Sequence, residues 1–184
     1  RLGVAVVGLG VGKGHLQAYA EIPALFDVKA VCDLNLDKAR ATAAEFGVAR
    51  HTTSLAELLA SPDVDMVDLC TPPNTHLGLI EQALAAGKHV VCEKPLVGSL
   101  LEADAVQAAL RDAKGQLFPI FQYRFGNGLQ RLKHLQAKGL ARHALITTME
   151  THWRRDSDYY EVAWRGKWAT EMGGVCLTQA CHAH

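Results

Sequence analysis

A glycine-rich turn near the N-terminus limits most strongly what this chain can fold into. Residues 4–7 form an apolar run rich in valine, and the residues that follow include Gly8, Leu9, Gly10, Gly12 and Lys13. A buried strand that enters a helix through such a turn places unpaired backbone N–H groups and the positive end of a helix dipole together. The pattern therefore predicts a phosphate-binding turn at the start of the first helix.

The spacing of these glycines departs from the G-x-G-x-x-G pattern of dinucleotide-binding turns. Gly8 suits the tight turn and Gly10 suits a close backbone approach to a pyrophosphate, but the third glycine position holds Lys13. Either the turn is one residue longer, or Gly12 takes the packing role of the third glycine. An ordinary strand–helix turn without a ligand is the remaining alternative.

Short apolar runs alternate with helical patterns through the first 122 residues. We predict strands at 4–8, 28–33, 64–70, 89–93 and 118–122, and helices at 15–22, 37–46, 54–61, 75–86 and 100–113. The strands show little period-two alternation, which is typical of a parallel sheet covered on both faces. The predicted fold class is α/β, with a doubly wound parallel sheet forming a Rossmann domain over residues 1–122.

The sequence pattern changes after residue 122. Glycines 126 and 128 interrupt it, a short helix is predicted at 129–138, and a long strand is predicted at 144–153. We place the beginning of a second, α+β domain at 123–184. This segment is too short to close a sheet of its own, so we expect the chain to be a fragment of a longer protein.

Composition excludes several classes of partner. The formal net charge is +0, which gives no electrostatic reason to expect a nucleic acid or an anionic membrane. No run of 18 apolar residues and no signal-peptide pattern occurs, so we expect a cytoplasmic protein without a membrane span. The odd number of cysteines and their spacing predict buried free thiols and no metal site; they are Cys32, Cys70, Cys92, Cys176 and Cys181.

An acidic residue at the end of the second predicted strand bears on cofactor choice. Asp33 lies 25 residues after Gly8 (33 − 8 = 25), where a carboxylate accepts hydrogen bonds from ribose hydroxyls and repels a 2′-phosphate. We therefore expect NAD, while Lys38 or Arg40 keeps NADP open as the alternative. Asp33 has a second possible role as the N-cap of the following helix.

Two loops follow strands that end at the same edge of the predicted sheet. The first contains Thr71, Pro72, Pro73, Asn74 and His76, and we expect it to contact the cofactor. The second reads Glu93-Lys94-Pro95, and the Lys94 ammonium there can stabilise a developing alkoxide. The alternatives are a helix-start residue for His76 and a surface lysine for Lys94.

In this order and spacing, the motifs resemble the Gfo/Idh/MocA family of NAD(P)-dependent sugar and polyol oxidoreductases. The resemblance covers the whole chain, and the Glu-Lys-Pro element is its most specific part. It implies that Lys94 and His182 are the catalytic residues, that the Lys94–Pro95 peptide is cis, and that Glu93 and Lys94 adjoin the cofactor. Thr178 stands where many members carry an aspartate, which puts a carboxylate-assisted proton relay in doubt.

The resemblance also implies a substrate and an assembly. We expect hydride transfer between a nicotinamide cofactor and a hydroxyl or carbonyl carbon of a sugar, sugar derivative or cyclitol, and a homo-oligomer when the protein is full length. Residues 123–184 would begin the substrate and oligomerisation domain, with substrate contacts from Arg124, Tyr160, Trp164, Arg165, Lys167 and Thr178. The alternatives are packed core for these side chains, and a non-catalytic redox sensor or an inactive fragment for the chain.

Overall fold

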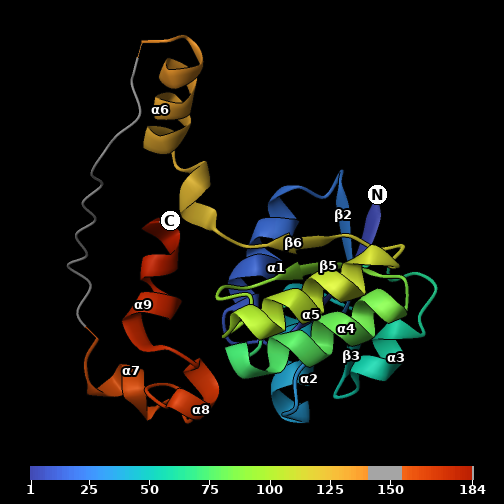
Figure 1. Ribbon diagram of the computed structural model, residues 1–184. Coiled ribbons are helices and arrows are strands. Elements are labelled where there is room, and N and C mark those ends of the chain that lie inside the picture. Colours follow the sequence, from blue (N-terminus) through green and yellow to red (C-terminus); the bar gives the residue numbers. More distant parts are fainter. Residues whose placement is uncertain (141–154, 184) are drawn as a thin grey trace.

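The computed structural model describes residues 1–140 and 155–183 (Figure 1). In its first part, strands and helices alternate along the sequence as predicted. The elements are β1 (Leu2–Val7), α1 (Gly12–Glu21), β2 (Phe26–Cys32), α2 (Leu36–Phe46), β3 (Arg50–Thr52), α3 (Leu55–Leu59), β4 (Met66–Leu69), η1 (Pro73–Thr75), α4 (His76–Ala85), β5 (His89–Cys92), α5 (Leu100–Arg111) and β6 (Leu117–Pro119).

The six strands form one sheet in the order β3-β2-β1-β4-β5-β6, and every neighbouring pair is parallel. The chain runs outward from β1 to β3 and then returns to place β4 on the other side of β1. This confirms the predicted doubly wound Rossmann fold. In such sheets, ligands bind outside the carboxyl ends of the strands where the order reverses, which here lies between β1 and β4.

Apolar side chains fill both faces of the sheet. In β1, Val4 and Val6 point to one face and pack with Leu16 of α1 and with α2. The alternate residues of β1 point to the other face and pack with Ile80 of α4, Val106 of α5 and α3. Figure 1 shows α4 and α5 side by side over that face. Burial on both faces explains why the strand sequences are continuously apolar.

Helix boundaries follow local capping signals. The Ser54 side chain accepts a hydrogen bond from the Glu57 backbone N–H at 3.4 Å, which confirms the capping box that begins α3. Asn35 caps α2 by accepting from the Lys38 backbone N–H at 3.0 Å, so Asp33 is not its N-cap. Gly47 ends α2 with a φ of 67°, a left-handed conformation that favours glycine.

The largest differences from the sequence prediction concern β3, α1 and β6. β3 was missing from it, because this three-residue strand lies at the sheet edge and buries no apolar side chain. α1 begins at Gly12 rather than at residue 15, since the glycines of the turn already adopt the first helical turn. β6 ends at Pro119 instead of 122, and Gln122 begins a short 3-10 helix.

The regular elements among the described residues after 121 are all helices. They form η2 (Gln122–Phe125), α6 (Asn127–Ala137), α7 (Ser157–Glu161), α8 (Trp168–Glu171), α9 (Gly174–Thr178) and η3 (Ala180–Ala183). The predicted strand at 144–153 lies outside the described residues. Figure 1 shows α6 extending away from the sheet, and α7, α8 and α9 grouped beside the sheet domain. Among the described helices, none is long and apolar enough to cross a membrane.

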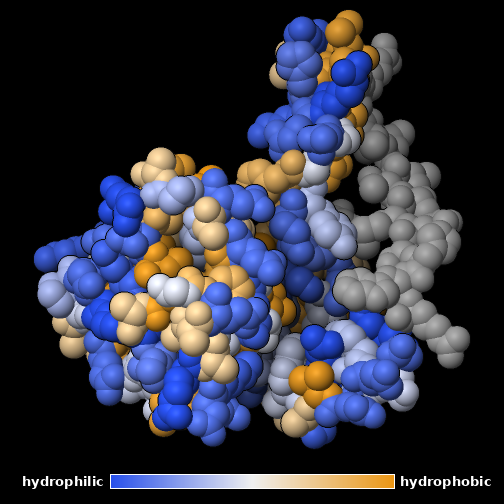
Figure 2. All heavy atoms as spheres, turned by 180° about the vertical axis from the view of Figure 1, so that it is seen from behind, coloured by the Kyte–Doolittle hydropathy of each residue, from blue (hydrophilic) through white to orange (hydrophobic). Residues whose placement is uncertain are grey.

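Helix α6 contributes little to the core. It buries none of its residues, and Figure 2 shows apolar surface on it. Leu129 and Leu132 are 48% and 42% exposed. Contacts of the later chain with the sheet domain come from α8, which packs against η1, and from α9, where Thr178 accepts from Lys94.

The cysteines divide into two classes. All five are unpaired; Cys32, Cys70 and Cys92 are buried as predicted, but the prediction is wrong for Cys176, which is exposed, and for Cys181, which is half-buried. The error arises because these two follow a glycine-rich turn on the short α9–η3 segment rather than a buried strand.

This division predicts the order of alkylation by iodoacetamide. Burial raises the pKa of Cys32 to about 11 and that of Cys70 to about 12, so at pH ~8 both remain protonated and inaccessible. We expect Cys176 to be labelled faster than the buried cysteines in the native protein, and peptide mass spectrometry over time measures this order. The variant Cys176→Ser should lack this fast phase of labelling. Labelling of Cys70 at the rate of Cys176 in the folded protein would contradict the structure.

Candidate active site

Close packing fixes the glycine turn against the end of β4. Gly8 has a φ of 89°, and a Cβ built on it would lie 2.7 Å from the Cys70 carbonyl oxygen. A Cβ on Gly12 would lie 2.9 Å from Val6 Cγ1 and 3.4 Å from Cys70 Cβ, whereas one on Gly14 would meet nothing. Gly12 therefore takes the packing role of the third glycine, and the turn is not extended by a residue.

The start of α1 is open toward the carboxyl ends of the strands. Val11 occupies the N-cap position, and no side chain caps the first N–H groups of this ten-residue helix. A Cβ on Gly10 would have no neighbour within 4 Å among residues 1–140 and 155–183, so these residues leave the space beside its backbone open. Open N–H groups and the positive end of the helix dipole suit a pyrophosphate. The Lys13 ammonium instead contacts Glu45 of α2 at 2.6 Å.

Asp33 ties the turn to the end of β2. One carboxylate oxygen accepts from the Leu9 backbone N–H at 3.0 Å and from Lys38 Nζ at 2.7 Å, and the other accepts from the Asn35 N–H at 3.0 Å. Burial raises the pKa of Asp33, but the hydrogen bonds from Lys38, Leu9 and Asn35 outweigh it and lower the pKa overall. The group is therefore an ionised hydrogen-bond acceptor at the carboxyl end of β2.

His76 joins the two loops that follow β4 and β5. Its ring is fully buried, with Nδ1 2.9 Å from the Pro95 carbonyl oxygen and Nε2 2.9 Å from the Thr71 carbonyl oxygen. Any contribution of His76 to cofactor binding is thus made by holding these loops in place. Pro72 precedes η1, Pro73 is buried, and Asn74 is exposed on the same loop.

Lys94 lies between the sheet domain and the later helices. Its peptide bond to Pro95 is cis, as the family resemblance implies. Its Nζ donates to the Thr178 carbonyl oxygen of α9 at 2.7 Å, and its backbone N–H donates to the Glu93 carboxylate at 2.9 Å. The ammonium therefore lies at the carboxyl end of β5 and reaches the segment that carries His182.

His182 stacks on Tyr123, with ring centroids 4.2 Å apart and planes at 24°. Its Nδ1 is buried and has no hydrogen-bond partner among the described residues. Burial and the nearby Lys94 ammonium lower the pKa of His182, although Glu93 opposes this. The ring is therefore neutral near pH ~7 and has a lone pair for a proton.

A pocket of about 250 Å³ brings the two predicted catalytic residues together. Lys94 and His182 line it with Val11 at the start of α1 and Thr71 after β4, so it adjoins the phosphate-binding turn. Trp164, Arg165 and Thr178 from the predicted substrate set also line it. These residues come from both ends of the sequence, and the fold places them around one space.

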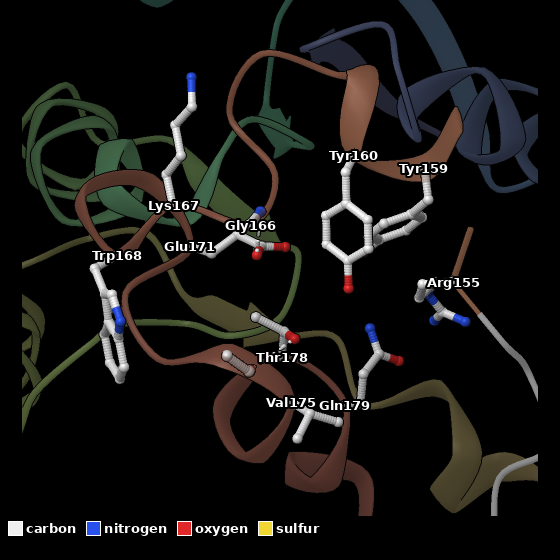
Figure 3. A pocket seen from close by; sticks show the side chains of 11 residues that line it. Arg155, Tyr159, Tyr160, Gly166, Lys167, Trp168, Glu171, Val175, Thr178 and Gln179 are labelled. Carbon is white, nitrogen blue, oxygen red and sulfur yellow. Dashed lines mark hydrogen bonds between the residues drawn. The ribbon is translucent and has the colours of Figure 1, made fainter. Parts of the chain in front are cut away.

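A second pocket of about 360 Å³ shares part of this lining (Figure 3). Tyr160, Lys167 and Thr178 line it, and Figure 3 shows the Tyr160 hydroxyl and the Thr178 side chain pointing toward the same hollow. Arg165 lies over the Tyr159 ring at 3.9 Å. Arg124, by contrast, is exposed and lines neither pocket.

Sequence reasoning missed several residues of the site. Glu171 is 8% exposed and accepts from the Gly166 N–H at 2.7 Å beside both pockets. Asp68 is fully buried in β4, and His15 of α1 lies between it and Glu93. Asp68 carried a usable signal, because a carboxylate within a continuous apolar strand is costly unless it is paired.

Comparisons with known proteins agree with this geometry. Residues 2–121 match the family model described as oxidoreductase family, NAD-binding Rossmann fold. Myo-inositol 2-dehydrogenase of Thermotoga maritima is 30% identical over 97% of this chain and 52% of its own length. Levoglucosan dehydrogenase of Pseudarthrobacter phenanthrenivorans is 33% identical over 67% of this chain and 34% of its own length.

A solved structure matches the chain throughout its length. The WlbA dehydrogenase from Bordetella pertussis, in complex with NADH and UDP-GlcNAcA, gives a TM-score of 0.86 at 28% identity over 100% of this chain and 53% of that one. The chain thus spans about a third to a half of the length of the relatives named here. The fold, the glycine turn and these matches show that the chain belongs to the Gfo/Idh/MocA family of NAD-binding oxidoreductases.

Proposed function

We propose that this protein is an NAD-dependent dehydrogenase that acts on a CH–OH group of a sugar, sugar derivative or cyclitol. The observation that carries the proposal is the shared pocket of Lys94 and His182, which adjoins the open start of α1. An ammonium donor and a neutral imidazole beside a dinucleotide crevice are the groups that oxidation of an alcohol requires.

The turn and Asp33 supply the cofactor site. Gly8, Gly10 and Gly12 let the backbone approach a pyrophosphate at the start of α1, and the Asp33 carboxylate accepts from the adenosine ribose. Leu9 anchors this carboxylate through its N–H. NAD, when bound, supplies the hydride acceptor. Lys38 already pairs with Asp33, and it is the cation that keeps NADP open as the second cofactor.

Lys94 and His182 have different roles in oxidation of the alcohol: Lys94 stabilises the oxygen, and His182 accepts the proton. The Lys94 ammonium has three donors and uses one of them on Thr178, so others remain for the substrate oxygen. Hydrogen bonding there stabilises alkoxide character as hydride leaves the carbon. The neutral His182 ring takes the hydroxyl proton, and it returns this proton in the reverse reduction.

Thr178 does not replace the aspartate that many members carry. Its hydroxyl donates to the Gly174 carbonyl oxygen at 2.9 Å within α9, and a threonine cannot hold a charge. A carboxylate relay is thus absent at this position, and proton transfer rests on His182. Thr178 contributes its carbonyl oxygen, which orients the Lys94 ammonium.

Aromatic and cationic side chains suit a polar, ring-shaped substrate. Tyr160 and Trp164 offer faces for stacking, and Arg165 and Lys167 offer donors for hydroxyl, carboxylate or phosphate oxygens. The named relatives act on myo-inositol and levoglucosan, and one neighbour is a complex with UDP-GlcNAcA. We further propose that residues 123–184 belong to the substrate domain, and that the full-length protein is a cytoplasmic homo-oligomer.

Removal of either catalytic residue should abolish turnover without abolishing cofactor binding. We expect Lys94→Ala and His182→Ala in the full-length protein to lower kcat by about 100- to 10,000-fold, because each removes a proton donor or acceptor. NADH formation is followed by absorbance with a sugar and cyclitol panel, and NADH binding by fluorescence. Exposed His51→Ala serves as the control. Wild-type turnover in Lys94→Ala would contradict the mechanism.

The pH dependence of oxidation should report the neutral state of His182. Its pKa is lowered by burial and by Lys94, so protonation disables the base only below the ordinary histidine value of about 6.5. We expect kcat/KM for oxidation to be constant near neutral pH and to fall on the acid side below that value. An acid limb centred above pH ~7 would show that another group acts as the base.

Cofactor choice should depend on Asp33. Asp33→Ala removes the ribose acceptor and the anchor of the Leu9 N–H, so we expect NAD affinity to fall about 10-fold or more and the preference over NADP to narrow. Fluorescence titration with NADH and NADPH measures both. Asp37→Ala, whose side chain is 90% exposed on α2, is the matched control. An unchanged preference would remove Asp33 from the ribose site.

A further inference from the structure

A chain of polar groups links α1 to the catalytic lysine behind the glycine turn. The Tyr19 hydroxyl donates to Asp68 Oδ2 at 2.9 Å, and His15 Nδ1 lies 2.8 Å from the same oxygen. His15 Nε2 lies 3.2 Å from Glu93 Oε1, and Glu93 Oε2 accepts the Lys94 backbone N–H at 2.9 Å. The chain crosses from α1 to β4 and on to the loop after β5.

We propose that His15 is a positioning residue for the reaction: its imidazolium bridges Asp68 and Glu93, and Glu93 thereby fixes the backbone of Lys94. This role rests on the proposed function of Lys94. His15 does not line the pocket, and it acts on Lys94 through the Glu93 carboxylate.

Both ring nitrogens of His15 must carry a proton in this arrangement. Each faces a carboxylate oxygen, which accepts hydrogen bonds and cannot donate when ionised. Asp68 is fully buried, and a buried carboxylate is costly without a cationic partner. Burial lowers the pKa of His15, but the hydrogen bonds to Asp68, Cys70 and Glu93 outweigh it and raise the pKa to about 12.

The same chemistry disfavours a metal ion in the cluster. His15 Nδ1, an Asp68 oxygen and Cys70 Sγ lie within 4.8 Å of one another, which is a spacing that three ligands could have. A doubly protonated ring offers no lone pair to a metal. Burial raises the pKa of the Cys70 thiol to about 12, so the thiolate is not formed at neutral pH. The His15 imidazolium thus supplies the positive charge beside Asp68 and Glu93.

The direction of the Glu93 carboxylate depends on His15. Its side chain is 13% exposed, with one oxygen held by His15 and the other by Lys94. Burial raises the pKa of Glu93, but His15 and Lys94 outweigh it and lower the pKa overall. The other titratable groups that interact with Glu93 are Cys70, Cys92, Cys181 and His182. His15 is thus a main cation that keeps Glu93 ionised.

Replacement by a neutral side chain of similar reach tests this role. In the full-length protein, we expect His15→Gln to lower kcat by about 10-fold or more, with the KM for NAD changed far less, because Lys94 loses its fixed backbone. Without the imidazolium, the pKa of Glu93 is higher, so Glu93 takes up a proton at a higher pH. Because a protonated Glu93 holds the Lys94 backbone less firmly, the fall of kcat toward acid pH should begin at a higher pH. Gln17→Ala, on the exposed side of α1, is the matched control.

A double-mutant cycle with Glu93→Gln tests whether His15 acts on turnover through the Glu93 carboxylate. A glutamine side chain does not titrate, so we expect Glu93→Gln and the double variant to share one kcat and one pH profile, without the shift seen in His15→Gln. Tyr19→Phe keeps the charge of His15 and should leave the acid limb in place. Full additivity, or an unshifted limb in His15→Gln, would overturn the proposal.

The protonation state of His15 and the turnover of the wild-type protein separate this proposal from the proposed function. Histidine NMR of the full-length protein should find the His15 ring protonated at pH ~9, and a neutral ring there would contradict the bridge. NADH binding and thermal unfolding show that the variants are folded. If the wild-type protein does not turn over any substrate, the proposed dehydrogenase function is contradicted. If the wild-type protein is active but the pH profile of His15→Gln is not shifted, only the role of His15 is contradicted.

Discussion

The close contact between the glycine turn and the end of β4 is the constraint on which the site depends. Gly8 approaches the Cys70 carbonyl oxygen so closely that a side chain would collide with it, and Gly12 packs against Val6 and Cys70 in the same way. These contacts set α1 directly beside the switch between β1 and β4. The open start of the helix, the loop after β4 and the loop after β5 therefore face one crevice.

Charge pairing then sets the geometry within that crevice. Asp33 binds the turn through Leu9, and His15 connects β4 to the loop that carries Lys94. Both groups join segments far apart in the sequence, and His15 also lowers the pKa of the Glu93 carboxylate. Since Lys94 also contacts Thr178, the same loop meets the segment that carries His182. The proposed catalytic pair, Lys94 and His182, thus lies between the end of β5 on one side and the α9–η3 segment on the other.

Much of the fold could be predicted from sequence because its signals are local. Continuous apolar strands, the Ser54 capping box and the Gly47 helix end each depend on a few neighbouring residues, and the structure confirms them. β3 could not be predicted, since its three residues bury no apolar side chain and so leave no hydrophobic pattern in the sequence. The strand expected at 144–153 lies outside the described residues and stays a prediction.

The site was less predictable because its contacts are long-range. The strand-end rule placed Lys94 and Asp33 correctly at one edge of the sheet, and the family resemblance supplied His182. No local pattern, however, indicates that His15 meets Asp68 across 53 positions or that His76 is buried between two loops. Arg124, whose chemistry suits a substrate, is exposed and lines neither pocket, so its predicted substrate contact stays a prediction.

The most direct test of the central claim is to follow the hydride itself. The full-length protein is incubated with NAD and a panel of sugars and cyclitols deuterated at carbon, and the NADH formed is analysed by mass spectrometry. Direct transfer from a CH–OH carbon predicts deuterium in the NADH made by the wild-type protein, and at least about 100-fold slower NADH formation by Lys94→Ala. Unlabelled NADH, or equal labelled NADH from Lys94→Ala, would contradict the account.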